Sequence, residues 1–442
     1  MKVPRIALIS EHACPLAQSG GVDCGGQNVY VANVARQLAA RGWSVDVFSR
    51  RDSPGQPVIT EWLPGIRVIS VPAGPAHGIP KEELLPHIGE FAAWMQRFMR
   101  WQARPYDIVH ANFFMSAWVG VELRRAFGIP LVVTFHALGR VRRAHQNGAD
   151  GFPDARFAME QEAMDEADLI VAECPADLAD MQRFYRVDAN RVRIVPCGFD
   201  PAEFRPLSRR LSRRLLGMPA NEFSVLQLGR MVPRKGVDTV TESIAVLRDR
   251  YRIPAVLYIV GGDSRRPDPD STPEIGRLAR IAAGLAIRDN GSIGGQRDRH
   301  ELAHYYSAAN VFVTTPWYEP FGITPLEAMA CARPVVGADV GGIRFSVVHG
   351  KTGFLVPPRD PVALAGYLAR LYRNRGLAQA MGQAGHARAR ARFTWSIVVD
   401  QLAAVYREAA RSVGAEPTEA GDYTSARPGR SVPVPMPVAL GT

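Results

Sequence analysis

Residues 311–342 read VFVTTPWYEPFGITPLEAMACARPVVGADVGG, and they decide the fold class. The apolar run at 311–316 is rich in β-branched residues and predicts a buried strand, and the segment 325–332 predicts a helix. The next apolar run, PVVGAD, predicts a second strand. A strand, a helix and a strand in this order are typical of a parallel sheet whose faces are covered by helices.

The same alternation fills most of the chain in two blocks. In the first block, from residue 5 to residue 196, helical patterns at 27–41 and 81–102 alternate with the apolar runs RIALIS, VDVFS, RVISVP, DIVHAN, LVVTFHA, DLIVAE and VRIVP. In the second block, after RPLSRRLSRRLLG, helical patterns at 237–250, at 273–285 and before Asn310 alternate with the runs VLQLGR, AVLYIVGG and, near its end, FLVPP. The chain has 442 residues, of which 47% are hydrophobic, so it is long enough for two α/β domains with a cleft between them.

A domain junction is predicted at 197–207, where CGFDPAEFRPL carries Gly, Asp and two prolines. We therefore expect an N-terminal domain over 1–198 and a C-terminal domain over 199–393. The segment 394–412 predicts a final helix, with Thr394 as its N-cap, that packs back on the N-terminal domain. Residues 413–442 are Pro-rich and lack periodicity, which predicts a disordered tail.

The composition excludes several classes of protein. No apolar stretch approaches the roughly 20 residues that cross a bilayer, and the first apolar run is interpreted as a strand and not as a signal peptide. These two observations predict a cytoplasmic location, and five cysteines without metal-ligand spacing predict reduced thiols. The net charge of +10 rests on 49 arginines and four lysines. Codon bias explains this excess; the alternative is an anionic partner such as a phosphate, a nucleic acid or a membrane surface.

Loops that follow the predicted strands are expected to carry the chemistry, because ligands of such sheets bind beyond the carboxyl ends of the strands. After the first strand, SGGVDCGGQNVY places glycines ahead of a helix, where backbone N–H groups can approach a phosphate or a sugar; a flexible loop is the alternative. The spacing is not GxGxxG, which disfavours a nicotinamide site. After the strand that includes VLQL, the cations Arg230, Arg234 and Lys235 suit a diphosphate, and an exposed basic loop is the alternative.

Two carboxylates, with seven residues between them, follow the strand at 311–316. Glu319 lies in the loop and Glu327 on the next helix, which is predicted to begin near Gly322. The free N–H groups of that helix suit an anion, and both carboxylates suit the hydroxyls of a ligand. His136, at the end of LVVTFHA, is a candidate to bind substrate in the cleft; the alternative is a buried histidine whose hydrogen bonds are satisfied.

Two further side chains are candidates for binding an anion. Lys81 is predicted in the first turn of a helix, where a cation opposes the helix dipole and therefore suggests a ligand. Arg156 precedes a glutamate by four residues, which fits either a ligand contact or an ordinary helix pair. Asp268 and Asp270 are expected to face solvent, and no metal site is predicted.

The motifs together resemble those of the retaining glycosyltransferases of family 4: GGVDCGGQNVY, LGRMVPRKG, the GG after LYIV, and EPFGITPLE followed by ARPVVGADVGG. The resemblance covers about residues 5–411. It is nearest to the subgroup that contains sucrose-phosphate synthase, mannosylfructose-phosphate synthase and the inositol-phosphate N-acetylglucosaminyltransferase of mycothiol synthesis. It implies the GT-B fold, in which two Rossmann-like domains face each other across a cleft, with the nucleotide-sugar donor mainly on the C-terminal domain and the acceptor on the N-terminal domain.

The resemblance also implies roles for single residues on the donor side. Arg230 and Lys235 would hold the donor diphosphate, and Glu319 would bind hydroxyls of the transferred sugar. His136 would lie near the sugar and the leaving group, which completes the implied catalytic set. The other implied donor contacts are Glu327 at the ribose, the backbone N–H groups of Phe321, Gly322 and Ile323, Gly26 at the diphosphate and Arg297 at the base.

The implied reaction transfers a sugar, with glucose from a UDP-sugar as the expected case, to a small phosphorylated acceptor bound by Gln27, Lys81 and Arg156. The acceptor hydroxyl would attack on the face from which the nucleotide leaves. No metal or other cofactor would be required, because two cations stabilise the leaving diphosphate. The alternatives are a lipid-linked or polysaccharide acceptor, which leaves peripheral membrane contact open, and a nucleotide-sugar isomerase on the same fold. Nucleic acid is not an expected partner, since the basic residues are dispersed, and the departures at Cys24 and in HALGRVRRAHQ leave the acceptor open.

Overall fold

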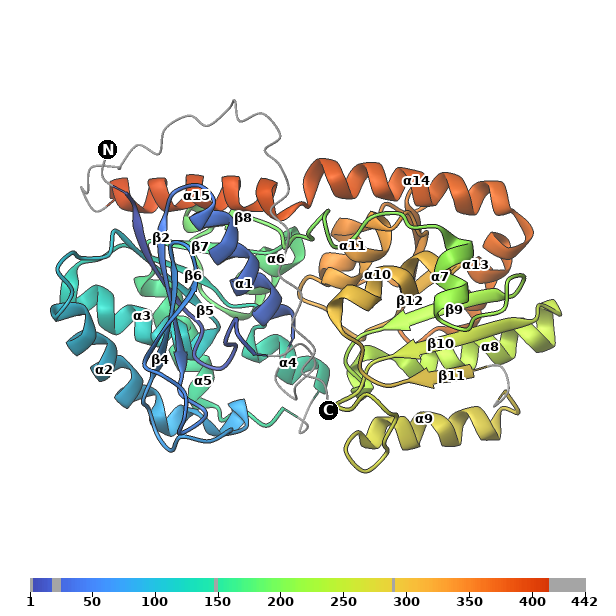
Figure 1. Ribbon diagram of the computed structural model, residues 1–442, viewed down its shortest axis with the longest axis horizontal. Helices are drawn as coiled ribbons and strands as arrows, with labels where there is room; N and C mark the ends of the chain where they lie inside the picture. The colour runs from blue at the N-terminus through green and yellow to red at the C-terminus, as the bar shows by residue number, and fades with distance from the viewer. Residues whose placement is uncertain (1–2, 18–24, 147–149, 288–290, 413–442) are drawn as a thin grey trace, which may run out of the picture.

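A computed structural model describes residues 3–17, 25–146, 150–287 and 291–412 of the chain. Figure 1 shows two α/β domains side by side, each with helices around a central sheet. The predicted fold class, α/β with two sheets, is therefore confirmed. The segment 413–442, predicted to be a disordered tail, lies outside the described residues, as does the part of the glycine loop at 18–24.

The N-terminal domain is built on an eight-stranded sheet with the order β3-β4-β2-β1-β5-β6-β7-β8. Its strands are β1 (Arg5–Ile9), β2 (Ser44–Arg50), β3 (Ile59–Leu63), β4 (Ile66–Val71), β5 (Ile108–Asn112), β6 (Leu131–Thr134), β7 (Leu169–Ala172) and β8 (Val192–Ile194). All neighbouring pairs are parallel except β3 and β4, which are antiparallel. The strand order reverses between β1 and β5, so the loops after these strands border the place where such sheets bind ligands.

The antiparallel edge strand β3 is an addition to the predicted parallel sheet. Its side chains Ile59 and Leu63 are 42% and 41% exposed. Because β3 has no buried face, its sequence lacks the alternation of apolar and polar residues that marks a half-buried strand. The available signal was the dipeptide Pro64-Gly65 between two β-prone runs, which predicts a hairpin. Gly65 has a φ of 80°, in the region that favours glycine.

Six α-helices follow the strands in the described part of this domain: α1 (Gly26–Ala39), α2 (Ile88–Arg100), α3 (Phe114–Phe127), α4 (Gly139–Gln146), α5 (Ala155–Glu166) and α6 (Pro175–Phe184). The predicted helix at 81–102 is wrong in its first part. Residues 81–87 form two 3-10 turns, η1 (Lys81–Glu83) and η2 (Leu85–His87), before α2 begins. Pro86 explains the interruption, because proline has no N–H to donate and disfavours helical backbone at the residue before it.

Side chains of β1 show how the sheet fills two cores. Ile6 and Leu8 pack with α1 and α15 (Trp395–Ser412) in one buried cluster. Ala7 and Ile9, which point to the other face, pack with α2 and α3 in a second cluster. The two-residue period of a strand thus divides consecutive apolar residues between two layers of helices.

The C-terminal domain has a six-stranded, fully parallel sheet with the order β11-β10-β9-β12-β13-β14. Its strands are β9 (Phe223–Leu228), β10 (Ala255–Val260), β11 (Gly291–Gly294), β12 (Val311–Thr314), β13 (Val335–Ala338) and β14 (Gly353–Val356). Its helices are α7 (Arg209–Leu215), α8 (Val237–Tyr251), α9 (Pro273–Gly284), α10 (Arg299–Ala308), α11 (Ile323–Ala330), α12 (Gly341–Ser346), α13 (Pro361–Arg373) and α14 (Arg375–Arg392). The strand order reverses between β9 and β12, so the loops after these two strands are the counterparts of those after β1 and β5.

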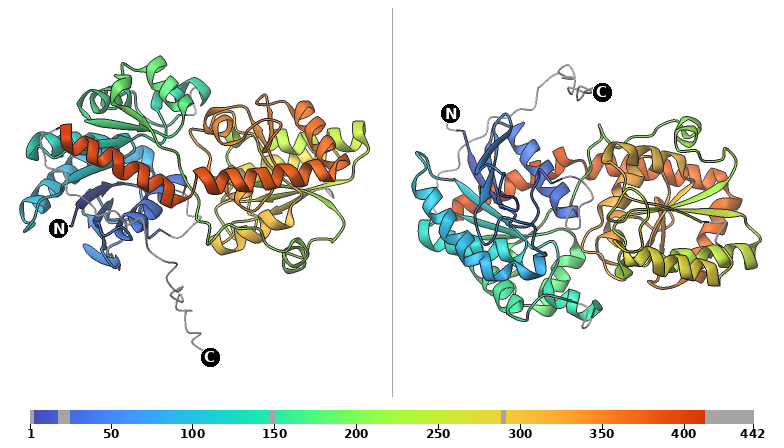
Figure 2. Two further views of the ribbon diagram at one scale, coloured as in Figure 1. Left: turned by 90° about the horizontal axis from the view of Figure 1, so that it is seen from above. Right: turned by 60° about the horizontal axis from the view of Figure 1, so that its bottom comes forward.

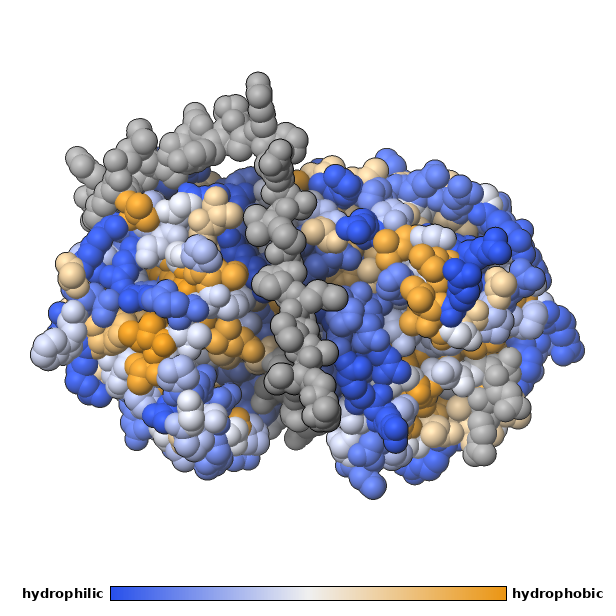
Figure 3. Space-filling model, in the orientation of Figure 1, coloured by the Kyte–Doolittle hydropathy of each residue, from blue (hydrophilic) through white to orange (hydrophobic). Residues whose placement is uncertain are grey.

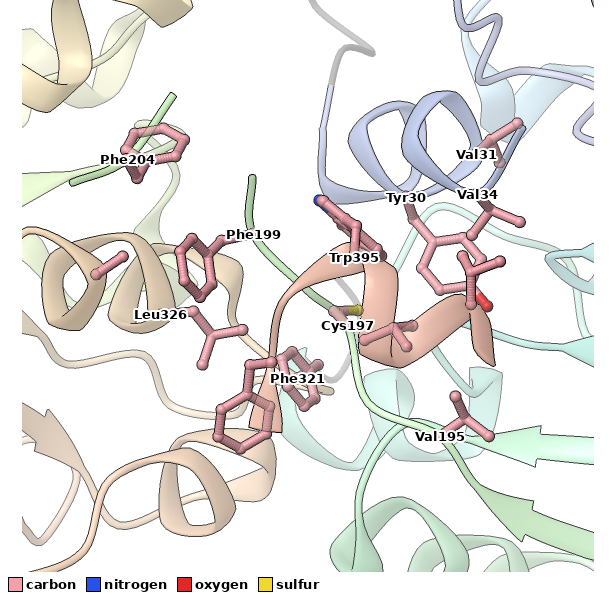
Figure 4. Close-up of a cluster of buried hydrophobic side chains, with 14 of the residues drawn as sticks. Tyr30, Val31, Val34, Val195, Cys197, Phe199, Phe204, Phe321, Leu326 and Trp395 are labelled. Carbon is pink, nitrogen blue, oxygen red and sulfur yellow. The ribbon is translucent and has the colours of Figure 1, made fainter. Parts of the chain in front are cut away.

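The chain crosses twice between the domains, and the two crossings pair with each other. The Phe199 N–H donates to the Phe393 carbonyl at 2.8 Å, and the Trp395 N–H donates to the Phe199 carbonyl at 3.1 Å. Figure 2 shows α14 and α15 end to end across the two domains, and α15 packs on α1, β5 and β6. In Figure 4, Trp395 lies beside Tyr30 of α1, with their ring centroids 5.7 Å apart. One buried cluster therefore continues from one domain into the other.

The face shown in Figure 3 is dominated by hydrophilic side chains, with apolar side chains in separate small patches. Within the described part of the chain, no helix combines the length and the apolar character that crossing a membrane would require. The predicted N-cap of the last helix is present, since Thr394 Oγ1 accepts from the Ile397 N–H at 3.4 Å. The cytoplasmic location stays a prediction.

Candidate functional site

Two loops of the C-terminal domain lie against each other at the carboxyl ends of β9 and β12. Gly236, at the end of the first loop, has a φ of 64°, and a Cβ atom there would lie 2.0 Å from the carbonyl oxygen of Thr315. Thr315 Oγ1 donates to the Gly236 carbonyl at 2.7 Å, and the Trp317 N–H donates to the Arg234 carbonyl at 2.9 Å. Because only glycine fits at 236, the loop with the predicted cations stays close to the loop that carries Glu319.

This packing brings Lys235 and Glu319 into contact. Lys235 Nζ donates to Glu319 Oε2, and the two side chains are 20% and 12% exposed. Burial lowers the pKa of Lys235 to about 8, against the opposing charge of Glu319. Burial alone would raise the pKa of Glu319, but the charge of Lys235, followed by those of Arg234 and Arg230, outweighs it and lowers that pKa. The site thus holds one ionised carboxylate among several cations, which suits a diphosphate that carries a sugar.

The backbone of Glu319 is fixed by the paired glycines that begin α12. A Cβ atom on Gly341 would lie 1.8 Å from the Glu319 carbonyl oxygen, and the Gly342 N–H donates to that oxygen at 3.2 Å. As predicted, the next helix, α11, begins beside this loop, with Gly322 as its N-cap at a φ of 89°. The first N–H groups of an α-helix have no acceptor within the helix, so Ile323 starts a turn that can bind an anion or a hydroxyl.

Glu327 lies on α11 and is 3% exposed. Its Oε2 accepts from the hydroxyl of Tyr306 at 2.9 Å, and its Oε1 lies 3.2 Å from Arg299 Nη2. Burial raises the pKa of Glu327, against the charge of Arg299. Sequence patterns did not predict Tyr306 or Arg299. Both lie on α10, and the Arg299 guanidinium and the Tyr306 hydroxyl together hold the carboxylate of Glu327. The resemblance places this carboxylate at the ribose.

The remaining donor candidates of this domain lie at two strand ends. Arg230 is exposed in the loop after β9. Arg297 follows β11, where its Nε donates to the Tyr305 hydroxyl at 2.9 Å and its Nη1 donates to the Arg265 carbonyl at 2.9 Å. Arg297 is therefore held at the outer edge of the sheet, whereas Lys235 and Glu319 lie near its centre.

In the N-terminal domain, His136 follows β6 with a φ of 58°, which is uncommon for a residue with a side chain. Its Nδ1 lies 2.9 Å from Glu173 Oε1, and its Nε2 lies 3.0 Å from Asn112 Oδ1. Glu173 also accepts from Cys197 Sγ at 3.0 Å. Neither Asn112 nor Glu173 was predicted. The signal was that each is a polar residue at the end of an apolar run, DIVHAN or DLIVAE.

Gly26 and Gln27 begin α1 at the boundary between the domains. A Cβ atom on Gly26 would lie 3.7 Å from Ile323 Cδ1, so the N-termini of α1 and α11 meet there. Gln27 Nε2 donates to Ser10 Oγ at 3.1 Å and to the Asn112 carbonyl at 3.2 Å. The first contact places Gly26 near Ile323, whose backbone N–H group is a predicted donor contact. The hydrogen bonds of Gln27 place its side chain at the same strand end as Asn112.

Lys81 does not lie in the helix that the sequence predicted. This residue lies in the 3-10 turn η1 and not in the first turn of an α-helix, so the argument from an opposed helix dipole does not apply. Lys81 Nζ forms an ion pair with Glu82 Oε1 at 3.2 Å. Its predicted contact with a phosphorylated acceptor stays a prediction.

Arg156 is fully buried on α5. Its Nε donates to Glu160 Oε1 at 2.7 Å, and its Nη2 donates to the Ala137 carbonyl, one residue after His136. Its guanidinium carbon lies 4.7 Å to 4.9 Å from the ring centroids of Phe113, Phe114 and Phe152. In this arrangement Arg156 supports the backbone next to His136, and its predicted acceptor contact stays a prediction.

The acidic groups outside this site give no argument for a metal. The Asp270 N–H donates to Asp268 Oδ1 at 3.0 Å within a loop. Among the described residues, the side chains of Asp298, His300 and Glu301 lie close enough together to bind a metal ion. However, Asp298 and Glu301 form the capping box of α10, which already accounts for their positions. That metal and other cofactors are not required stays a prediction.

A cavity of about 530 Å³ lies away from these loops, where β7 and β8 begin. Its lining includes Arg124 and Asp168, paired at 3.0 Å, and Arg193 and Glu408, which form an ion pair between β8 and α15. Because these four side chains are already paired within the protein, they are not free to bind a charged ligand.

Comparison with known proteins identifies the family. Residues 25–198 match the family model described as glycosyl transferase 4-like domain, and residues 208–388 match the one described as glycosyl transferases group 1. The chain is 35% identical to a D-inositol 3-phosphate glycosyltransferase of Corynebacterium diphtheriae over 93% of this chain and 96% of the relative. It is 36% identical to the protein of the same name from Geodermatophilus obscurus, over 96% and 94% of the two chains.

A solved structure agrees with this assignment. Sucrose-phosphate synthase from Thermosynechococcus elongatus superimposes with a TM-score of 0.84 at 34% identity, over 92% of this chain and all of that chain. The expected GT-B arrangement of two parallel-sheet domains is therefore confirmed, and with it a glycosyltransferase that takes its sugar from a nucleotide donor. The chain belongs to the family 4 glycosyltransferases.

Proposed function

We propose that this glycosyltransferase transfers glucose or a closely related sugar from a UDP-sugar to a hydroxyl of a small phosphorylated acceptor, with retention at the anomeric carbon. The observation that carries the donor side is the partly buried contact between Lys235 and Glu319, beside the N-terminus of α11. The acceptor side is supported by relatives whose names specify D-inositol 3-phosphate and sucrose phosphate.

The donor diphosphate would change the partner of Lys235. In the structure the ammonium group contacts Glu319, and a diphosphate bound beside it offers more negative charge. Lys235 would then bind the phosphate oxygens together with Arg230, and Glu319 would be released to accept hydrogen bonds from hydroxyls of the sugar. One event would thus bind the leaving group and position the sugar.

The ribose and the base would lie farther along the same domain. Glu327 is held by Tyr306 and Arg299 and would accept from the ribose hydroxyls. Arg297, at the end of β11, would contact the base. The backbone N–H groups of residues 321–323 would add neutral donors to the diphosphate or the sugar.

The reaction would form a bond between the acceptor oxygen and the anomeric carbon as the bond from that carbon to the diphosphate breaks. The proton of the acceptor hydroxyl would pass to the leaving diphosphate on the same face of the sugar. Charge that grows on the diphosphate would be stabilised by Arg230 and Lys235 without a metal ion. His136, oriented by Glu173 and Asn112, would face the sugar and the leaving group from the N-terminal domain.

A screen of donors against acceptors tests this function. We would incubate the purified full chain with UDP-glucose, UDP-N-acetylglucosamine or GDP-mannose, each with inositol phosphate, with fructose 6-phosphate, or with the unphosphorylated form of each acceptor. The readouts are nucleoside diphosphate release and product mass, with and without EDTA. We expect one pair to react only when the acceptor is phosphorylated, and EDTA to leave the rate unchanged. Release of no nucleoside diphosphate from any pair, or donor consumption without acceptor, would contradict the proposal.

A further inference from the structure

Tyr318 belongs to the C-terminal domain by its position in the chain, but its ring packs into the core of the N-terminal domain. It lies in the loop after β12, directly before Glu319, and is 7% exposed. The buried cluster that contains it is otherwise built, among the described residues, from residues 7 to 192. One aromatic side chain of the donor loop thus crosses the boundary between the domains.

The ring of Tyr318 is held by both domains. His145, near the end of α4, stacks on it with centroids 5.0 Å apart and an angle of 19° between the ring planes. Gln146 Nε2 donates to the Tyr318 hydroxyl. From the C-terminal domain, the guanidinium carbon of Arg234 lies 5.3 Å from the centroid of the same ring. Because Arg234 precedes Lys235 and Tyr318 precedes Glu319, this contact lies next to both members of the ion pair between Lys235 and Glu319.

The other end of α4 is anchored near His136. The Gly139 N–H, at the start of the helix, donates to both carboxylate oxygens of Glu160 at 3.0 Å. Arg156 Nη2 donates to the Ala137 carbonyl, and a Cβ atom on Gly139 would lie 2.8 Å from Arg156 Nε. The first turn of α4 therefore has little freedom to move relative to His136.

Helix α4 connects these two anchored ends over a short distance. It has eight residues, which corresponds to a length of about 12 Å. Figure 1 shows α4 at the edge of the N-terminal domain that faces the C-terminal domain. A short helix held at both ends transmits a displacement, because its backbone hydrogen bonds keep its length fixed.

We propose that α4 couples the two halves of the active site, and that Tyr318 is the positioning residue through which it acts. Stacking of Tyr318 on His145 sets the position of Glu319 and Lys235 relative to His136. The proposal rests on the function proposed above, since it assigns a purpose to the approach of these groups. Misplacing reacting groups by about 1 Å can lower a rate by about 100-fold, so this contact would matter for transfer more than for nucleotide binding.

The test compares Tyr318→Ala, His145→Ala and the double variant. Each single change is expected to lower kcat by about tenfold while the Kd of the nucleoside diphosphate changes by less than about threefold. The double variant is expected to be no slower than the slower single variant within about twofold, since both remove the same contact. Tyr318→Phe, which keeps the ring and loses only the bond from Gln146, is expected to retain kcat within about threefold.

The matched control is Tyr367→Ala. Tyr367 stacks on Phe354 at the same angle of 19°, with centroids 4.3 Å apart, but both rings lie within the C-terminal domain. This variant is expected to lower the melting temperature and leave kcat unchanged. Multiplicative losses in the double variant, or a Kd that rises as much as kcat falls, would overturn the proposal, because the ring would then act independently of α4 or only on the nucleotide.

Hydrogen exchange separates this proposal from the proposed function. The probe is whichever of UDP, GDP and ADP binds tightest, and no acceptor or turnover is needed. Binding to the wild type is expected to slow amide exchange in α4 of the N-terminal domain, and this protection is expected to be lost in Tyr318→Ala. Protection of α4 that persists in Tyr318→Ala, or is absent in the wild type, would refute the coupling whether or not any donor and acceptor pair reacts.

Discussion

Lys235 Nζ and Glu319 Oε2 form an ion pair that joins the loop after β9 to the loop after β12. Burial lowers the pKa of Lys235 to about 8, so its positive charge is present below that pH and lost above it. If the charged form binds the donor diphosphate, kcat/KM for the donor will fall as the pH rises through about 8.

A pH profile of kcat/KM between about pH 6 and about pH 10 measures this effect. Lys235→Arg, which stays charged over the whole range, is expected to move the fall to higher pH even if its rate is lower. A wild-type profile that is flat up to about pH 10 would mean that the charge of Lys235 does not act on the donor.

The carboxylate of Glu319 is predicted to act on the sugar and not on folding. Glu319→Gln keeps the shape of the side chain and removes the charge that pairs with Lys235. We expect kcat to fall by about 100-fold, which corresponds to about 2.7 kcal/mol in the barrier, while the chain stays folded. Nucleoside diphosphate affinity should stay the same or increase, because Lys235 no longer has a competing anion. Calorimetry and steady-state kinetics measure both, and Asp268→Ala, in a loop outside this site, is the control expected to match the wild type.

Lys81 and Arg156 are predicted to fail in different ways when changed to alanine. Lys81→Ala is expected to raise the KM for the phosphorylated acceptor by about tenfold with an unchanged melting temperature, since its partner Glu82 is partly exposed. Arg156→Ala leaves the carboxylate of Glu160 buried without its cation, which costs about 3–5 kcal/mol of folding free energy. Thermal unfolding of the two variants distinguishes these effects. A KM for the phosphorylated acceptor that stays at the wild-type value in Lys81→Ala would argue against a phosphate contact.

The parts of this fold that sequence patterns predicted are those fixed by local chemistry. Apolar runs predicted the parallel strands, because strands inside a covered sheet must be buried. Gly322 predicted the start of α11, because its backbone conformation favours glycine. β3 was missed because it has no buried face, and α2 begins late because Pro86 interrupts the pattern. These errors lie at an edge and at a helix start, where the local signal is weak or mixed.

The candidate site also contains residues that sequence patterns predict and residues that they do not. Lys235 and Glu319 lie in loops with recognisable motifs, so the sequence predicts their roles. Tyr318 could not be predicted, because its partner His145 lies on another domain and no periodicity relates them. Glu173 had only a weak signal as a polar residue at the end of an apolar run, and its contact with the His136 ring depends on two neighbouring strand ends meeting.

Gly236 is predicted to be necessary for the geometry of the ion pair. A methyl group there would lie 2.0 Å from the Thr315 carbonyl oxygen, so Gly236→Ala must separate the two loops and pull Lys235 away from Glu319. We expect kcat to fall by at least about tenfold. Gly217→Ala is the matched control, because Gly217 has a φ of 66° and a Cβ atom there would meet nothing within 4 Å. This control bears only the backbone strain, about 1 kcal/mol, and should keep the wild-type kcat. Equal activity of the two variants would show that the clash with Thr315 does not reach the catalytic groups.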